Sequence, residues 1–110
     1  MITNKDVFAK RKEEGALDEA YQMALVLMQG LKISDWDFKA FAWCLIDLIK
    51  RDVQAGHDQN LDHYRQQLQE IKLDPNDEVL SKSVRYALSL CNPHGQLISQ
   101  AKELSKQKRP

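Results

Sequence analysis

Apolar residues recur at helical spacing along most of this chain, and no stretch alternates with the period of a β-strand. The most apolar stretch is residues 34–50, where Ser34 and Asp37 resemble a capping box that can begin a helix. Its apolar residues occupy more than one helical face, namely Phe38, Phe41, Ala42, Leu45 and Ile49 on one and Trp36, Ala40, Trp43 and Leu48 on others. A helix of this kind must be covered on several sides. We therefore expect it to be the central element of an all-α domain.

Capping and breaking residues divide the remaining sequence into further helices. Thr3 can cap the first helix and Gly15 ends it, while Pro75 stops the fourth because the residue before a proline avoids the helical conformation. Asn76 is expected to cap the fifth helix, and Pro93 to open the sixth. The six expected helices cover residues 4–14, 17–30, 35–53, 61–73, 77–91 and 93–104.

Short turns join these helices in pairs, and two helices joined by a short turn pack antiparallel. Six helices then form three hairpins within a single domain, residues 1–110. The expected hairpins cover residues 3–30, 34–74 and 76–105. Residues 106–110 are too polar to pack and are expected to fray.

Composition and charge exclude several classes of function. The 16 Lys and Arg residues balance the 16 Asp and Glu residues, so the chain has no long-range attraction to nucleic acid or anionic lipid. The N-terminal sequence lacks the apolar core of a signal peptide, and the longest apolar run, residues 40–49, is interrupted by Asp47 and is too short to span a bilayer. We expect a soluble, cytoplasmic protein with no membrane or nucleic-acid partner, in which Cys44 and Cys91 are free, buried thiols.

Three motifs carry a resemblance to a known repeat family. They are GALDEA at residues 15–20, FxxFAxxL at residues 38–45 and LDP at residues 73–75. Together they resemble the tetratricopeptide-repeat (TPR) family, whose unit is a helix pair of about 34 residues with large and small apolar groups at fixed positions. The resemblance implies a TPR-like right-handed array of antiparallel helical hairpins, in which the first helix of each pair lines a concave groove.

The same resemblance, with the distribution of aromatic and charged residues, implies a set of residues that bind a partner protein or peptide. This set is Lys5, Lys12, Trp36, Lys39, Trp43, Asp47 and Arg85. Tryptophan side chains dominate many interfaces energetically, so two tryptophans beside a lysine would form an effective recognition surface. Alternatively, Trp36 staples the turn before the central helix, Trp43 packs into the core and Asp47 is a solvated edge residue. Ala9 and Ala40 replace the asparagines of the family's carboxylate-clamp subtype, so capture of a C-terminal carboxylate is not expected.

One enzymatic pattern competes with this interpretation. Arg51 and His57, in the run RDVQAGH, resemble the arginine and histidine of the HEPN ribonucleases, in which histidine would act as a general acid or base and arginine would steady the phosphate. Alternatively, Arg51 simply ends a helix, where the helix dipole stabilises a cation. A structural homodimer is a further alternative, because a repeat array with imperfect caps leaves end surfaces to cover.

Metal and nucleophile chemistry have little support in the sequence. His57, Asp58, Asp62 and His63 are possible metal ligands, but their offsets do not place the two histidines on one helical face. Cys44 lies in the most apolar segment, where a thiolate is disfavoured. We therefore expect a non-enzymatic adaptor or scaffold module that needs neither a cofactor nor a metal.

Overall fold

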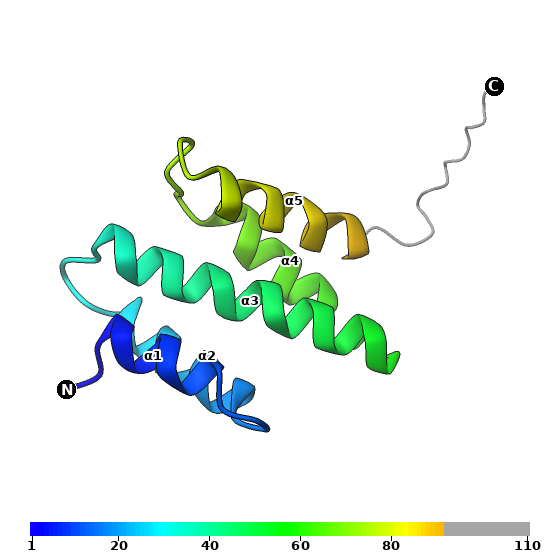
Figure 1. The fold of residues 1–110 in the computed structure, drawn as a ribbon, viewed down its shortest axis with the longest axis horizontal. Coiled ribbons are helices and arrows are strands. Elements are labelled where there is room, and N and C mark those ends of the chain that lie inside the picture. Colours follow the sequence, from blue (N-terminus) through cyan, green and yellow to red (C-terminus); the bar gives the residue numbers. More distant parts are fainter. Residues whose placement is uncertain (92–110) are drawn as a thin grey trace.

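The computed structural model describes residues 1–91, and all regular structure in this part of the chain is helical. The helices are α1 (Asn4–Arg11), α2 (Leu17–Leu27), α3 (Asp35–Ala55), α4 (Leu61–Glu70) and α5 (Glu78–Cys91) (Figure 1). The all-α class predicted from the sequence is therefore confirmed for these residues. The predicted sixth helix, residues 93–104, and the polar end, residues 106–110, lie outside the described residues.

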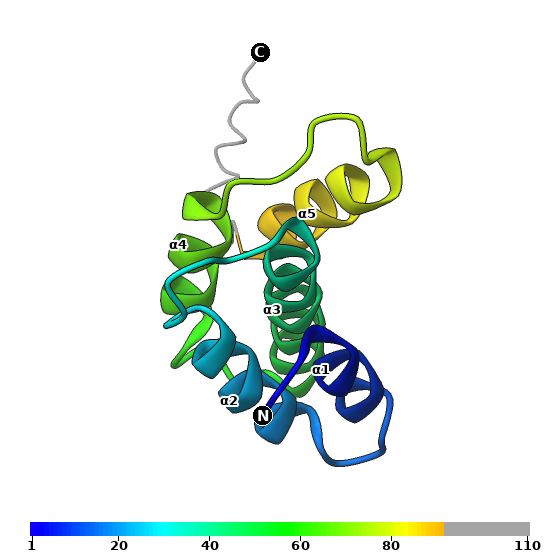
Figure 2. The same ribbon diagram turned by 90° about the vertical axis from the view of Figure 1, so that its left-hand side faces the viewer.

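Helix α3 is the axis of the domain. It packs against each of the other four helices, and α1 also packs against α2 and α4 against α5. In the view along α3, helices α1 and α5 lie on one side of it and α2 and α4 lie on the other (Figure 2). Helices α1, α3 and α5 therefore form one side of the domain, with α3 between the other two.

The core forms around α3 because the apolar residues of this helix cover more than one of its faces. Its buried residues are Ala40, Phe41, Ala42, Cys44, Leu45, Ile46, Leu48, Ile49 and Asp52. The prediction that this helix is covered on several sides is confirmed, and burial of this apolar surface is the main driving force for folding. Within residues 1–91 no helix is both long and apolar enough to cross a membrane.

Tyr21 connects α2 to both α3 and α4. Its ring stacks on Phe41, with 6.1 Å between the centroids, and meets Tyr64 edge-on at 5.5 Å. Its hydroxyl donates a hydrogen bond of 2.7 Å to Oε1 of Gln67. Burial raises the pKa of Tyr21, and the hydrogen bond to Gln67 only partly opposes this rise. The buried phenol is therefore both packed and hydrogen-bonded, as expected for a tyrosine at the junction of three helices.

Capping boxes begin both α1 and α3. The Ser34 hydroxyl accepts a hydrogen bond of 3.2 Å from the backbone N–H of Asp37, whose carboxylate accepts the Ser34 N–H at 3.1 Å. Thr3 and Asp6 form the same arrangement at α1. Burial alone would raise the pKa of Asp37, but hydrogen bonds from the Asn4 side chain and from Ser34 outweigh it and lower the pKa. The helix starts predicted at Thr3 and Ser34 are both confirmed.

The start of α5 differs from the prediction. Its cap is Asp77 rather than Asn76, because Oδ1 of Asp77 accepts a hydrogen bond of 3.1 Å from the backbone N–H of Leu80. The backbone N–H of Asn76 instead donates to Oδ1 of Asp74 at 2.9 Å, so Asn76 belongs to the preceding turn. Each carboxylate thus accepts a hydrogen bond from a backbone amide two or three residues away. Asp74 stabilises the turn, and Asp77 caps the start of α5.

Four helix ends also differ from the prediction. α2 ends at Leu27 instead of residue 30. α1 stops at Arg11 instead of residue 14, and the chain then turns through Gly15, whose φ of 78° lies in the left-handed region. α3 continues to Ala55 and ends at Gly56, with φ of 73°. α4 ends at Glu70 rather than at residue 73. Glycine adopts a left-handed backbone without steric cost, which explains why the turns after α1 and α3 contain it.

Replacing Ser34 by alanine should lower the free energy of unfolding by about 1 kcal/mol, because the N–H of Asp37 loses its hydrogen-bond acceptor at the start of α3. Urea unfolding followed by circular dichroism measures this change. Ser89→Ala is the matched control, since the exposed Ser89 hydroxyl bonds the Tyr86 carbonyl within α5 and caps no helix start. An equal loss of stability in both variants would contradict the role assigned to the Ser34 cap.

Candidate functional site

Three aromatic side chains gather where α1 packs against α3. The ring of Phe8 meets the indole of Trp36 edge-on, with 6.2 Å between the ring centroids. Trp36 nevertheless remains 60% exposed, whereas Trp43, further along α3, is half-buried. Edge-to-face contacts between aromatic rings at this separation are attractive. Phe8 therefore positions Trp36 against α1 without removing it from solvent.

Arg11 holds Trp43 in place. Its guanidinium carbon lies 5.3 Å from the centroid of the Trp43 ring and 5.9 Å from that of Phe8, both within the range of a cation–π contact. The same guanidinium forms an ion pair with Asp47. Arg11 thus connects α1 to α3 through the Trp43 ring and the Asp47 carboxylate, while its contact with Phe8 lies within α1.

Lys39 plays the corresponding part between α3 and the start of α5. Its Nζ lies 4.7 Å from the centroid of the Trp36 ring and 3.3 Å from Oδ2 of Asp77. The pKa of Asp77 is lowered mainly by the hydrogen bond from the backbone N–H of Leu80 and further by the Lys39 ammonium. Together these contacts outweigh desolvation, which raises the pKa. Asp77 therefore stays ionised at neutral pH and both caps α5 and pairs with Lys39.

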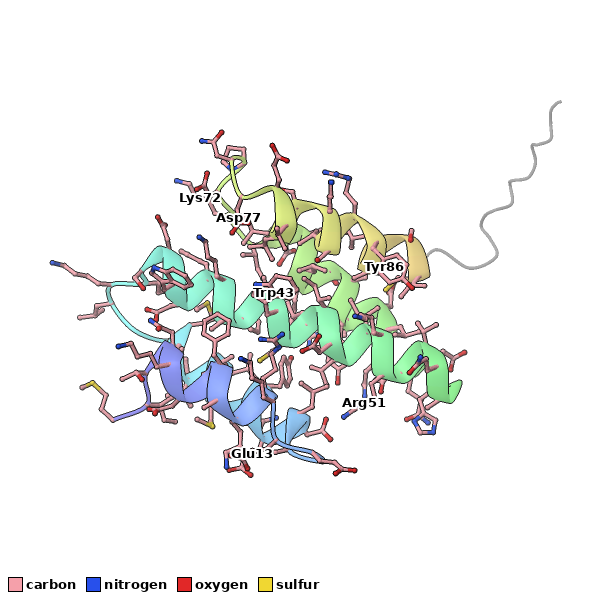
Figure 3. All side chains as sticks on the ribbon, viewed as in Figure 1. Glu13, Trp43, Arg51, Lys72, Asp77 and Tyr86 are labelled. Atoms are coloured by element: carbon pink, nitrogen blue, oxygen red, sulfur yellow. The ribbon has the colours of Figure 1, made fainter. Side chains whose placement is uncertain are left out.

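A shallow hollow of about 270 Å³ lies between α3 and α5. It is lined by Trp43, Ile46, Lys50, Lys82, Ser83 and Tyr86. Tyr86 is 55% exposed and stands on α5 opposite Trp43 on α3 (Figure 3). We define the α1–α3–α5 face by the residues of the aromatic cluster, its cations and this hollow: Phe8, Arg11, Trp36, Lys39, Trp43, Asp47, Lys50, Lys82 and Tyr86.

The structure places most of the site residues predicted from the sequence on this face. Trp36, Lys39, Trp43 and Asp47 lie on it through the contacts described above, while the exposed Lys5 and Lys12 flank Phe8 one turn away on either side of it along α1. Asp47 is neither a free acceptor nor simply solvated, because its carboxylate is paired with Arg11.

Arg85 is the predicted residue that lies elsewhere, since it lines a separate cleft. The sequence interpretation missed Phe8, Arg11, Lys50, Lys82 and Tyr86 as members of the face. One available signal was Tyr86, a large aromatic residue outside the apolar stripe of its helix. Leu80, Val84, Ala87 and Leu88 form that stripe.

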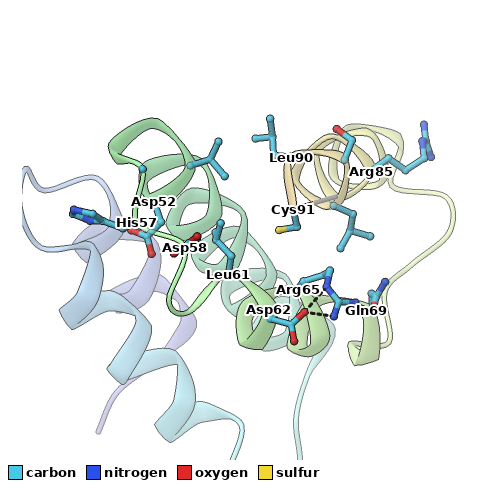
Figure 4. Close-up of a pocket in the computed structure, with 14 residues that line it drawn as sticks. Asp52, His57, Asp58, Leu61, Asp62, Arg65, Gln69, Arg85, Leu90 and Cys91 are labelled. Carbon is cyan, nitrogen blue, oxygen red and sulfur yellow. Dashed lines mark hydrogen bonds and ion pairs between the residues drawn. The ribbon is translucent and has the colours of Figure 1, made fainter. Parts of the chain in front are cut away.

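The second cleft is larger, about 1160 Å³, and lies between the end of α3, the start of α4 and the second half of α5 (Figure 4). His57, which follows the end of α3, lines this cleft, as do Arg85 and Cys91 on α5. Arg65 also lines it, but its guanidinium is engaged by Asp62 and by Oε1 of Gln69. The lining alternates between apolar groups and charges of both signs, so it defines no single ligand chemistry.

Arg51 and His57, the pair considered for a ribonuclease, are not brought together at this cleft. Arg51 is absent from the lining and its guanidinium forms ion pairs with Asp18, at 3.1 Å, and with the buried Asp52, at 2.9 Å. His57 is exposed, and its backbone N–H donates to the Asp52 carbonyl. The arginine thus has two carboxylate partners on α2 and α3 rather than an open position for a phosphate.

Both cysteines are free thiols with reduced reactivity. Burial raises the pKa of the Cys44 thiol to about 12, and the nearby Arg11 only partly opposes this effect. Burial also raises the pKa of the half-buried Cys91. Among residues 1–91 no group of three or more His, Cys, Asp or Glu side chains is arranged to hold a metal ion.

The α1–α3–α5 face is aromatic and cationic in character. It presents aromatic surface and lysine ammonium groups. Its one carboxylate, that of Asp47, is paired with Arg11, and Lys39 is paired with Asp77 at the start of α5. Aromatic side chains and arginine are enriched at protein interfaces, whereas lysine is depleted there. No family model matches this chain, and neither a curated protein nor a solved structure shows significant similarity to it.

Proposed function

We propose that this protein is a non-enzymatic interaction module, an adaptor or scaffold with a TPR-like hairpin arrangement, that binds a segment of a partner protein on the α1–α3–α5 face. The observation that carries the proposal is the pair of exposed aromatic residues, Trp36 at 60% and Tyr86 at 55%, on neighbouring helices. Large aromatic side chains that remain in solvent on helices are typical anchors for a protein partner.

The arrangement of the helices supports this proposal. α1, α3 and α5, the first helices of the three expected hairpins, share one side of the domain, and α2 and α4 occupy the other (Figure 2). α3 contacts both α1 and α5, so the three helices offer one continuous surface. A TPR-like array would place its binding groove on the same helices.

The contacts of the face also favour binding because they restrict its side chains before a partner arrives. Trp36 is held between Phe8 and Lys39, and Trp43 is held by Arg11. Ordering a mobile side chain on binding costs about 0.5–1.5 kcal/mol, so a face that is already ordered retains more of its contact energy as affinity.

The other functions considered receive less support. The ribonuclease interpretation has no geometric observation in its favour, since Arg51 pairs with Asp18 and Asp52. A second copy of the chain could cover the same aromatic residues, and sedimentation at micromolar concentration would reveal such a homodimer. We place the partner segment first because the face is divided into an aromatic cluster and a hollow, which suit an extended or helical segment.

Selection of short peptides from a displayed random library on the full chain tests the proposal. The affinity of the enriched peptides should fall at least about tenfold in Trp36→Ala and in Tyr86→Ala, because each change removes an exposed anchor. Trp43→Ala should abolish binding, provided that circular dichroism shows the fold to be retained. The matched control is Val26→Ala, an exposed apolar residue on α2, on the other side of the domain.

Two results would contradict the proposal. The first is that no enriched peptide loses affinity in the Trp36 and Tyr86 variants. The second is a loss of equal size in Val26→Ala, which would show that binding does not depend on this face. A homodimer that dissociates only in the Trp36 and Tyr86 variants would replace the partner segment with a second copy.

A further inference from the structure

The hollow between α3 and α5 combines aromatic walls with positive charge. Trp43 and Tyr86 are its aromatic residues, and Lys50 and Lys82 contribute one ammonium group each from the two helices. Both lysines are exposed, and neither forms an ion pair within the described part of the chain. No acidic residue lines the hollow.

Three acidic residues precede these lysines along α3 and α5, and none forms an ion pair with them within residues 1–91. Asp47 precedes Lys50 by one turn on α3, but its carboxylate is drawn to α1 by the ion pair with Arg11. Asp77 lies at the start of α5, where it pairs with Lys39 and caps the helix. Glu78 precedes Lys82 by one turn on α5, but it forms no ion pair within residues 1–91 and does not line the hollow. The lining of the hollow therefore contains two lysines and no acid.

The lysines of α1 extend this positive surface. Lys5 and Lys12 are exposed and, like the pair in the hollow, form no ion pair within residues 1–91. Exposed lysines on α1, α3 and α5 thus lie on the face or beside it. A ligand that covers the aromatic rings of the face is stabilised if it carries negative charge at the same time, and is repelled if it carries positive charge.

We propose that this hollow selects an acidic side chain, aspartate or glutamate, in the bound segment, placed between Lys50 and Lys82 and next to an apolar residue that contacts Trp43 and Tyr86. This inference rests on the proposed function, because it names the chemistry of the segment bound by that face. The same oxyanion chemistry could come from the C-terminal carboxylate of a peptide, and C-terminal amidation distinguishes the two sources.

Matched peptides on charge-reversed variants test the inference. Peptides enriched on the full chain are synthesised with an amidated C-terminus in three forms: the parent, one with each acidic residue changed to its amide, and one with each acidic residue changed to lysine. Fluorescence polarisation then gives their affinities for wild type, for the double variant Lys50→Glu/Lys82→Glu, and for the control Lys32→Glu/Lys72→Glu, whose exposed lysines lie outside the face.

We expect the parent peptides to contain acidic residues in excess of the library and to bind wild type at least about fivefold more tightly than their amide forms. Lys50→Glu/Lys82→Glu should reverse the preference toward the lysine forms, and the control should retain the preference of wild type. The preference should also weaken as the salt concentration rises, because the lysines are exposed.

The outcomes separate this inference from the proposed function. Peptides that depend on Trp36 and Tyr86 but bind equally well in parent and amide forms overturn the acidic preference and leave the proposed face intact. Binding that disappears on C-terminal amidation overturns the side-chain source of the carboxylate. The absence of any peptide that depends on the face overturns both.

Discussion

Replacing Leu45 by alanine is expected to lower the free energy of unfolding by about 2–5 kcal/mol. Leu45 is fully buried in the middle of α3, the helix that contacts all four others, so the lost methyl groups leave a cavity that no single neighbour can fill. Small domains are stable by only about 5–15 kcal/mol, and the change therefore removes a large share of the total. Urea unfolding of the full chain measures the loss.

Leu31→Ala provides the matched control for this prediction. The chemical change is identical, but Leu31 is fully exposed in the turn between α2 and α3, so stability should change by less than about 0.5 kcal/mol. Comparable losses in the two variants would show that α3 is not the central buried element. If Leu45→Ala proves too unstable to fold, the smaller change Leu45→Val should still lower the free energy of unfolding more than Leu31→Ala does.

The Cys44 thiol is expected to react with a thiol reagent at least about a thousandfold more slowly in the folded protein than in the unfolded chain near neutral pH. Its pKa is raised by burial from an ordinary 9.0 to about 12, and only the thiolate is reactive. Exclusion of the reagent from the core slows the reaction further. The rate is measured in Cys91→Ser, where Cys44 is the remaining cysteine.

The comparison variant is Cys44→Ser, which retains the half-buried Cys91 and should react much faster than Cys91→Ser. Equal rates in the two folded variants would contradict the burial of Cys44. Because the pKa of folded Cys44 lies above its unfolded value, its contribution to stability is complete below about pH 9 and is lost as the pH rises toward 12. Stability should therefore decline in strongly alkaline solution.

The candidate face links stability to function through the same side chains. Arg11 and Lys39 connect neighbouring helices while they hold the tryptophans, so changes to these cations should affect both the packing of α1 and α5 and the shape of the face. Trp36 and Tyr86 are exposed, and changes there should affect binding with little effect on stability. These exposed residues are therefore the better probes of function.

The sequence alone determined the features that depend on neighbouring residues. The helix starts at Thr3 and Ser34 were predictable because a capping box is formed by side chains and amides three residues apart. The central place of α3 was predictable as well, since a helix with apolar residues on several faces must be covered on several sides. Trp36 and Trp43 could be singled out for their size, although their exposure could not be predicted.

The composition of the candidate site was decided by the tertiary structure. Arg11 meets Asp47 across 36 positions of sequence, a pairing that no local pattern specifies. Arg85 and Tyr86 are neighbours in sequence, yet they line different hollows, because successive residues point about 100° apart around a helix. The rotation of α5 about its axis is set by the packing of Leu80 and Ala87 in the core. That packing turns Tyr86 toward Trp43 and Arg85 away from it.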